Sequence, residues 1–159
     1  MPTFKFGGDG VTVWGAMSYR GTGFLTALKG NLNASGYIDI LENSAIPSAH
    51  CLGYGDNFFL QDDGAPCHRS RIVETWKGEH DIRSIVWPPQ SPDWNPIENL
   101  WQDLGKGTRL HHSKNLKDLE RALFQTWDAI PMERCQTLVK SMPARIQAVI
   151  RARGGYTKY

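Results

Sequence analysis

Acidic residues at two places in the chain have the type and setting needed for metal chemistry. In "FFLQDDGAPCH" (58–68) Asp62 and Asp63 follow an apolar run, and in "WPPQSPDWNPIENLW" (87–101) Glu98 follows a run of prolines. Carboxylate oxygens are hard ligands that suit Mg²⁺ or Mn²⁺. Two such ions about 4 Å apart can hold the attacking and leaving oxygens of an in-line phosphoryl displacement. If their elements bring Asp63 and Glu98 to one cleft, the two stretches predict part of a divalent-cation site.

Asp62 and Asp63 also have a purely structural interpretation. The pair Asp-Gly favours turns, and an aspartate here could cap the helix expected over 68–79. Against this, the apolar run 57–61 is typical of a buried strand, and open α/β sheets bind ligands at the ends of their strands. The residues alone leave both interpretations open.

Glu98 has a structural alternative as well. Asn95 is a favourable N-cap, Pro96 suits the first helical position, and Glu98 then falls at N3, the arrangement of a capping box. In a capping box the glutamate reaches back to the backbone N–H of the cap. One carboxylate oxygen can do this while the other binds a metal, so the two roles are compatible.

The elements that must position these carboxylates follow from periodicity and turn residues. Alternation and β-forming residues predict a hairpin over 11–18 and 23–30. Two short apolar runs predict buried strands over 57–61 and 82–87. Helical spacing and capping residues predict helices over 33–46 (ended by Pro47), over 68–79 and from about Pro96 onward.

Beyond residue 114 the chain is predicted to be helical. Two apolar stripes mark the inner faces of these helices: Leu116, Leu119, Leu123 and Trp127 in one, and Leu138, Met142, Ile146, Val149 and Ile150 in the other. Strands come first along the chain, then alternating strands and helices, then terminal helices. This order predicts a mixed α/β layer fold with right-handed crossovers between parallel neighbours.

Composition places the chain among globular proteins. Its 159 residues are 40% hydrophobic, include six tryptophans and carry a net charge of +2. The length and the hydrophobic content predict a single domain over 1–159. No apolar run reaches the length of a membrane span, and the N-terminus lacks the layout of a signal peptide. Two acid-free basic segments, 105–117 and 144–159, either contact phosphates or are solvated surface.

The cysteines do not point to a disulfide framework or a zinc site. Cys51, Cys67 and Cys135 lie at unrelated spacings, which favours a reducing compartment. The residues that could bind zinc lie in no CxxC or HxxxH pattern: Cys67, His68, His111, His112 and Cys135. A Ser/His hydrolase is disfavoured too, because no nucleophile elbow is present.

The two acidic stretches resemble the signature blocks of a known family. "QDDGAPCH" and "WPPQSPDWNPIENLW" resemble the blocks around the second and third acidic residues of mariner-superfamily DNA transposases, which carry a DDE catalytic domain. The upstream "VWGAMSYRGTG" resembles the hairpin that precedes the second aspartate in that family. The resemblance extends from about residue 4 to the C-terminal "GGYTKY". The Trp-Pro-Pro-Gln-Ser-Pro block disfavours other metal nucleases of the same fold, such as integrases and resolvases.

The resemblance implies a ribonuclease-H-like α/β fold, a mixed sheet flanked by helices, and a choice between the aspartates. The family's aspartate lies five positions before a histidine, which here matches Asp63 and His68 and leaves Asp62 as a neighbour. Between Asp63 and Glu98 lie 34 residues, the spacing of one large branch of the superfamily. Asp63 and Glu98 are therefore the implied catalytic residues and ligands of Mg²⁺ or Mn²⁺. His68 is expected to orient the loop or to pack.

The resemblance also implies cut-and-paste DNA transposition. In that reaction a metal-activated water hydrolyses a phosphodiester at the transposon end, and the freed 3′-hydroxyl attacks target DNA. The implied partners are DNA, at transposon ends and target, and a second copy of the chain in a homodimer. Neither a membrane nor a small-molecule substrate is expected, and the implied location is the nucleus in a eukaryote or otherwise the cytoplasm.

One part of the family pattern is not matched. The family's first aspartate lies on an opening strand before the hairpin, and Asp9, Asp39 and Asp56 do not match its position. Gly64 also stands where asparagine commonly follows the second aspartate. We therefore expect the opening strand of the fold to be missing from this chain, and the chain alone to catalyse little or no strand transfer. The alternative is a domesticated or truncated remnant that serves as a non-catalytic DNA-binding or protein-interaction module.

Overall fold

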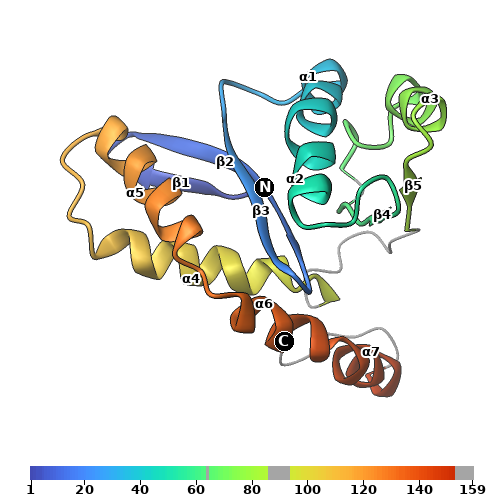
Figure 1. Cartoon of the computed structure of the whole chain (residues 1–159). Coiled ribbons are helices and arrows are strands. Elements are labelled where there is room, and N and C mark those ends of the chain that lie inside the picture. The colour runs from blue at the N-terminus through green and yellow to red at the C-terminus, as the bar shows by residue number, and fades with distance from the viewer. Residues whose placement is uncertain (64, 86–93, 153–159) are drawn as a thin grey trace. The chain divides into compact units, whose positions relative to one another are not determined.

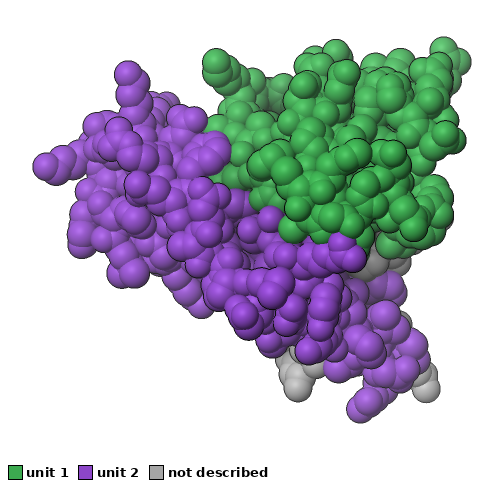
Figure 2. All heavy atoms as spheres, in the orientation of Figure 1, with its two compact units in different colours: residues 1, 12–16, 23–90 green, residues 2–11, 17–22, 91–159 purple. Residues whose placement is uncertain are grey.

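The computed structural model describes residues 1–63, 65–85 and 94–152, and Figure 1 shows the order of its elements. The strands are β1 (Thr3–Phe6), β2 (Asp9–Ser18), β3 (Gly21–Leu28), β4 (Phe59–Leu60) and β5 (Arg83–Ser84). The helices are α1 (Ala34–Ile40), the π-helical turn η1 (Leu41–Ala45), α2 (Ile46–Cys51), α3 (Arg71–Glu79), α4 (Ile97–Arg109), α5 (Leu116–Asp128), α6 (Met132–Lys140) and α7 (Met142–Arg151). They form two compact units, which Figure 2 colours separately: unit 1 holds residues 1, 12–16 and 23–90, and unit 2 holds residues 2–11, 17–22 and 91–159.

The sheet topology matches the predicted mixed organisation. β1, β2 and β3 pair in that order, and β2 and β3 are joined by only two residues, which requires antiparallel strands. The predicted hairpin is therefore confirmed. β4 and β5 form a parallel pair, with Phe59 opposite Arg83, and α3 lies in the connection between them. A helical crossover is what parallel neighbours need.

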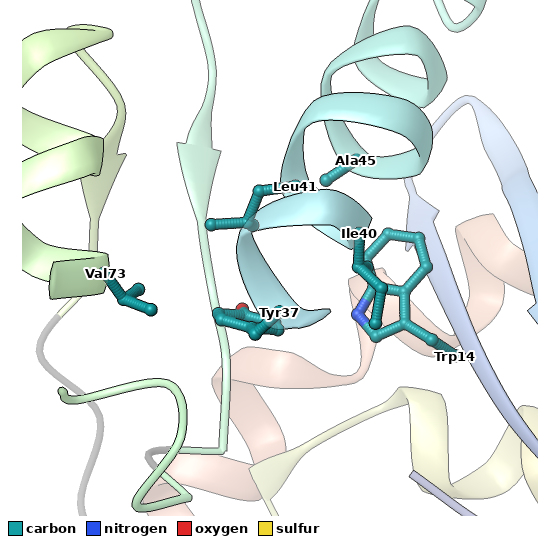
Figure 3. Packing of buried hydrophobic residues seen from close by; sticks show 6 residues of the cluster. All are labelled: Trp14, Tyr37, Ile40, Leu41, Ala45 and Val73. Atoms are coloured by element: carbon teal, nitrogen blue, oxygen red, sulfur yellow. The ribbon is translucent and has the colours of Figure 1, made fainter. Parts of the chain in front are cut away.

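The core of unit 1 is an apolar cluster whose buried members come from β2, α1, η1 and α3 (Figure 3). Its buried members are Trp14, Tyr37, Ile40, Leu41, Ala45 and Val73. β3 lies so near α2 that a Cβ on Gly23 would be 2.6 Å from the Ser48 Cβ, which excludes other residues at this position without movement of the chain. The Phe24 N–H donates a hydrogen bond to Ser48 Oγ over 2.8 Å, so the contact is polar as well as close.

The helix predicted over 33–46 begins as expected but does not end at Pro47. The Asn33 side chain caps α1 by accepting a hydrogen bond from the Gly36 N–H at 2.8 Å. The chain then continues through η1 into α2, where Pro47 occupies the first turn. In a regular helix a proline ring clashes with the carbonyl four residues earlier, and the wider π turn makes room for it. The predicted end at Pro47 is wrong for this reason.

The strands predicted over 57–61 and 82–87 are present, but their predicted burial is wrong. Phe59 is 60% exposed, and Arg83 and Ser84 are exposed too. Among the described residues β4 and β5 pair only with each other, so each keeps one edge without a strand partner there. The Arg83 guanidinium instead stacks over the Phe59 ring at 4.3 Å. Residues 86 and 87 of the second strand, and Pro88, Pro89 and Pro92, lie outside the described residues.

The core of unit 2 includes helices α4 and α5. Trp101 of α4 stacks on the buried Trp127 of α5, with ring centroids 5.1 Å apart. Leu119 and Leu123 are buried beside Trp127, which confirms the first apolar stripe except for Leu116 at the exposed start of the helix. The Asn115 side chain caps α5 by accepting from the Asp118 N–H at 2.9 Å.

The second apolar stripe is only partly confirmed. Leu138 of α6 and Val149 of α7 are buried, whereas Ile146 and Ile150 are 39% and 61% exposed. The stripe assumed one continuous helix, but α6 ends at Lys140 and α7 restarts at Met142, which shifts the phase of the inner face. The side chain buried one turn before Val149 is Arg145. No helix in the described residues is long and apolar enough to cross a membrane.

Candidate metal site

Asp63 lies in the loop that follows β4, and its side chain is 47% exposed. Its Oδ1 lies 2.8 Å from Nδ1 of His68 and accepts a hydrogen bond from the Ala65 N–H at 3.1 Å. The His68 contact, opposed by partial burial and aided by the Ala65 hydrogen bond, lowers the pKa of Asp63 to about 2. Within the described part of the chain, Oδ2 makes no hydrogen bond. Asp63 is thus an ionised carboxylate at neutral pH with one oxygen available to a cation.

His68 packs behind Asp63, as predicted. Its ring is 3% exposed and stacks on the Tyr37 ring, with centroids 3.9 Å apart and planes at 27°. The approach of Nδ1 to Asp63 is close, but neither ring nitrogen has a well-directed hydrogen bond to a described residue. His68 therefore holds the Asp63 carboxylate from one side, and its own ring position is set by Tyr37.

Asp62 has quite different surroundings from Asp63. Its Oδ2 accepts a hydrogen bond from Lys77 Nζ at 3.0 Å and another from the Tyr37 hydroxyl at 3.2 Å, and its side chain is 16% exposed. Burial, reinforced by the Asp62 charge, raises the pKa of Tyr37 far above its ordinary value, so the hydroxyl stays a donor. The hydrogen bonds of Asp62 to Lys77 and Tyr37 thus lie within unit 1.

The purely structural interpretation of the two aspartates is half right. Asp63 does form a turn, through its hydrogen bond from Ala65. Capping of the following helix is wrong, because α3 begins at Arg71 with Ser70 as its N-cap residue. Residues 66–69 form a turn before the helix starts, which moves the helix start beyond the reach of a side chain at 62 or 63.

Glu98 lies in the first turn of α4, in unit 2, and is half-buried. Pro96 has helical dihedral angles, φ −65° and ψ −20°, and the Asn95 carbonyl accepts a hydrogen bond from the Glu98 N–H at 3.1 Å. The helix therefore begins where the sequence predicts, with Asn95 and Pro96 at its entry. The side-chain half of the capping box stays a prediction.

Arg145 anchors the residue next to Glu98. The Arg145 guanidinium donates from Nη2 to Asn99 Oδ1 at 2.6 Å and from Nε to Ser141 Oγ at 2.8 Å, and Arg145 is 3% exposed. In the basic segment 144–159, for which the sequence left phosphate contact and solvated surface open, this arginine does neither and is an internal contact of unit 2. In contrast, Lys106 and Arg109 of the other basic segment lie exposed in the last turn of α4.

Lys77, Tyr37 and Arg145 were not identified from the sequence as parts of the site. One signal was available for Lys77: it lies four residues after the buried Val73, on the same face of α3. A lysine on the inner face of a helix needs an acidic partner, but the sequence does not select Asp62, since Glu74 and Glu79 lie closer in the chain.

The predicted ligands belong to different units, Asp63 to unit 1 and Glu98 to unit 2, so their convergence on one cation stays a prediction. Within residues 1–63, 65–85 and 94–152, no group of three or more His, Cys, Asp and Glu side chains is placed to hold a metal. The chemistry of the two donors fits Mg²⁺ or Mn²⁺, since both are carboxylates and Asp63 keeps an oxygen with open access.

Comparison with known proteins decides the family. Residues 7–120 match the family model described as DDE superfamily endonuclease, a range that contains Asp63 and Glu98. The chain belongs to this family. Proteins similar to the chain in sequence are named transposases.

Two nematode transposases show this kinship in sequence. The chain is 39% identical over 158 residues to the transposase of transposable element Tcb1 from Caenorhabditis briggsae, covering 99% of the chain and 58% of that protein. It is 37% identical over 158 residues to the Tc1 transposase of Caenorhabditis elegans, with the same coverages. The chain thus spans less than two thirds of the length of these relatives. The predicted resemblance to mariner-superfamily transposases is confirmed.

Solved structures confirm the fold of this DDE family member. The catalytic domain of the Mos1 mariner transposase superposes with a TM-score of 0.85 at 17% identity, over 99% of this chain and 81% of that one. A structure of the same catalytic domain with raltegravir and Mn gives a TM-score of 0.87 at 18% identity, over 99% and 82%. The predicted ribonuclease-H-like α/β fold is therefore confirmed.

Proposed function

We propose that the chain is the catalytic part of a cut-and-paste DNA transposase, in which Asp63 and Glu98 bind Mg²⁺ or Mn²⁺ at the reacting phosphodiester. The observation that supports the proposal is the environment of the Asp63 carboxylate, which lies within the residues that match the DDE family. This carboxylate is held by His68 and Ala65 through one oxygen, while the other is left open. Solved Mos1 structures that contain Mg or Mn support the choice of cation.

The residues of this chain would act by holding and orienting. Asp63 and Glu98 would supply hard oxygen ligands, and His68 would keep the Asp63 carboxylate turned in one direction. When bound, the cation supplies positive charge to the attacking and leaving oxygens of an in-line displacement. The substrate would be a phosphodiester at a transposon end, followed by target DNA for strand transfer. Exposed Lys106 and Arg109 are available for sequence-independent contacts with phosphates.

DNA is the proposed partner, and solved Mos1 assemblies support it: one is a paired-end complex and another is a strand transfer complex. We also propose action as a homodimer, in the nucleus of a eukaryote or otherwise in the cytoplasm. With two acidic ligands instead of the family's three, the 159-residue chain alone should bind cations weakly and support little or no strand transfer.

The decisive experiment measures Mn²⁺ binding by the full 159-residue chain, using electron paramagnetic resonance of free Mn²⁺. Asp63→Asn and Glu98→Gln should each weaken binding by roughly tenfold, and the double variant by less than the product of the two, because both side chains hold one ion. Asp56→Asn is the matched control: it removes a carboxylate that is 94% exposed and paired with His50. Additive effects, or none from one variant, would show that the carboxylates do not share a site.

A second experiment tests the reaction. Mg²⁺-dependent nicking and strand transfer are measured on a duplex that carries the DNA flanking the coding region. The chain alone should give little product, and any product should vanish in Asp63→Asn. Robust cleavage by the chain alone would contradict the expectation that Asp63 and Glu98 without a third acidic ligand support little reaction. DNA binding that persists without Mn²⁺ binding would instead favour a non-catalytic remnant.

A further inference from the structure

Tyr37 connects the buried core of unit 1 with the loop that carries Asp63. It lies in α1, is 1% exposed, and belongs to the core cluster together with Ile40 and Leu41 (Figure 3). Its backbone N–H donates a hydrogen bond at 3.0 Å to the carbonyl of Asn33, the N-cap residue of α1. Both the helix and the core therefore fix the position of the Tyr37 side chain.

The ring and the hydroxyl of Tyr37 contact two different residues near Asp63. The ring stacks on His68, with centroids 3.9 Å apart, and the hydroxyl donates a hydrogen bond to Asp62 Oδ2 at 3.2 Å. Asp62 Oδ2 accepts a second hydrogen bond, from Lys77 Nζ at 3.0 Å, so it is held without the hydroxyl as well. The contact that depends on Tyr37 most strongly is therefore the stack on His68.

The orientation of the His68 ring depends on this stack. The His68 backbone N–H donates to the Ala65 carbonyl at 2.8 Å, which fixes the backbone but not the ring. The residue is 3% exposed, and neither ring nitrogen has a well-directed hydrogen bond to a described residue. Stacking against a fixed aromatic face favours one ring plane over others. In the plane that Tyr37 favours, Nδ1 of His68 lies 2.8 Å from Oδ1 of Asp63.

We propose that Tyr37 is a positioning residue for the metal ligand Asp63, and that it acts through its ring on His68 and not through its hydroxyl. The inference rests on the proposed function, in which Asp63 binds the divalent cation. Tyr37 fixes the plane of the His68 ring, and the ring holds Oδ1 of Asp63. Oδ1 then stays turned towards the Ala65 N–H, and Oδ2 stays available for the cation. A ligand held in this way binds a metal more tightly, because less freedom is lost on binding.

The first test measures the Mn²⁺ affinity of the full chain by electron paramagnetic resonance, with circular dichroism to establish folding. Tyr37→Leu removes the ring and should weaken Mn²⁺ binding by about fivefold. Tyr37→Phe keeps the stack and removes only the hydroxyl, so its Mn²⁺ affinity should stay within about twofold of wild type. Trp14→Leu is the matched control, because it removes a buried ring of the same cluster from β2. It should destabilise the chain but leave the Mn²⁺ affinity within about twofold of wild type.

A double variant tests whether Tyr37 acts through His68. His68→Ala should weaken Mn²⁺ binding by about fivefold. Tyr37→Leu/His68→Ala should bind within about twofold of His68→Ala, because both changes break one series of contacts. Additive losses would show that Tyr37 acts on Asp63 by another route, contrary to the inference.

A second readout needs no metal. The Ala65 N–H donates a hydrogen bond to Asp63 Oδ1 at 3.1 Å, so hydrogen exchange of this amide reports whether the carboxylate is held in place. Followed by NMR, exchange should be about threefold faster in Tyr37→Leu and His68→Ala than in wild type. It should be unchanged in Tyr37→Phe.

Three results would overturn the inference. If Tyr37→Phe weakens Mn²⁺ binding as much as Tyr37→Leu does, the hydroxyl positions the ligand and the stack does not. If folded Tyr37→Leu binds as wild type does, or Trp14→Leu loses as much affinity, Tyr37 supports the fold alone. If His68→Ala binds Mn²⁺ as wild type does, no positioning passes through His68, and this variant decides even where Tyr37→Leu does not fold. If instead Asp63→Asn binds Mn²⁺ as wild type does, the proposed function fails, whereas exchange of the Ala65 amide still tests how the carboxylate is held.

Discussion

The two units hold their predicted metal ligands in parallel ways. In unit 1 the buried cation Lys77 binds Asp62, the residue just before Asp63, and in unit 2 the buried cation Arg145 binds Asn99, the residue just after Glu98. Lys77 and Arg145 are the buried lysine and arginine of the described residues. In both units the hydrogen bonds of the cation reach the neighbour of the ligand. Fixing the neighbour holds in place the backbone beside each predicted ligand.

The contacts of the two buried cations, Lys77 and Arg145, differ in their chemistry. Lys77 holds a carboxylate, so its removal releases a charge, whereas Arg145 donates to the amide of Asn99 and the hydroxyl of Ser141. The aromatic support differs too. Asp63 has the small Tyr37–His68 stack beside it, while α4, which carries Glu98, rests on the Trp101–Trp127 stack. The surroundings of Asp63 therefore include a buried charge pair, and those of Glu98 a large buried aromatic stack.

The largest effect should come from the aromatic support of unit 2. Trp127→Ala removes a side chain that is 1% exposed and stacked on Trp101, and it should lower the free energy of unfolding by about 4 kcal/mol. Trp127→Phe keeps an aromatic ring and should cost about 1–2 kcal/mol. Urea denaturation followed by circular dichroism measures both. A cost below about 2 kcal/mol for Trp127→Ala would show that the stack contributes little to unit 2.

The next largest effect should come from the charged tether of unit 1. Lys77→Met leaves Asp62 without its ammonium and should lower the free energy of unfolding by about 3 kcal/mol. Asp62→Asn/Lys77→Met should cost about 1 kcal/mol, because a pair of charges can be removed together at small cost. Thermal or urea unfolding of the two variants distinguishes them. If the double variant is as unstable as the single one, the loss is due to packing of the lysine stem and charge is secondary.

Local sequence patterns predicted the elements well, and their failures have definite causes. The hairpin, the Asn33 cap and the start of α4 follow from short-range rules that act within a turn or two. The inner face of α7 was wrong because the helix restarts at Met142, and Pro47 did not end its helix because a π turn precedes it. Periodicity assumes one uninterrupted helix, and neither break has a strong local signal.

In the candidate site too, local motifs predicted some residues, whereas the roles of others depend on contacts distant in the chain. Asp63, Glu98 and His68 could be selected from two short motifs, and packing of His68 followed from them. The roles of Asp62, Lys77 and Arg145 depend on contacts 15 and 46 residues apart in the chain, which no local pattern encodes. The predicted burial of β4 and β5 was wrong for the same reason, since burial depends on which elements cover the two strands.

A smaller effect should appear in the pH dependence of unit 1. The pKa of Asp63 is about 2 in the folded chain, below its ordinary value, so the ionised side chain stabilises the fold above about pH 4. This stabilisation is lost as the pH falls towards 2. Since the side chain is 47% exposed, solvent screening should limit it to about 1 kcal/mol or less. Urea unfolding at pH 6 and pH 3 should show wild type losing stability relative to Asp63→Asn; an equal pH response would mean that the His68 contact does not form.

The smallest expected effects on stability come from alanine substitutions at two helical glycines, one in each unit. A Cβ on Gly107 of α4 would lie 2.5 Å from Cγ2 of Thr126 of α5, whereas a Cβ on Gly78 of α3 would meet nothing within 4 Å. Alanine favours a helix over glycine by about 1 kcal/mol, so Gly78→Ala should stabilise the chain by about 0.5 kcal/mol. At Gly107 the same gain is opposed by strain between α4 and α5, and Gly107→Ala should destabilise by about 1 kcal/mol. Thermal unfolding measures both signs. If Gly107→Ala is also stabilising, the Thr126 side chain moves aside at little cost, and the close contact of α4 with α5 is not what requires glycine there.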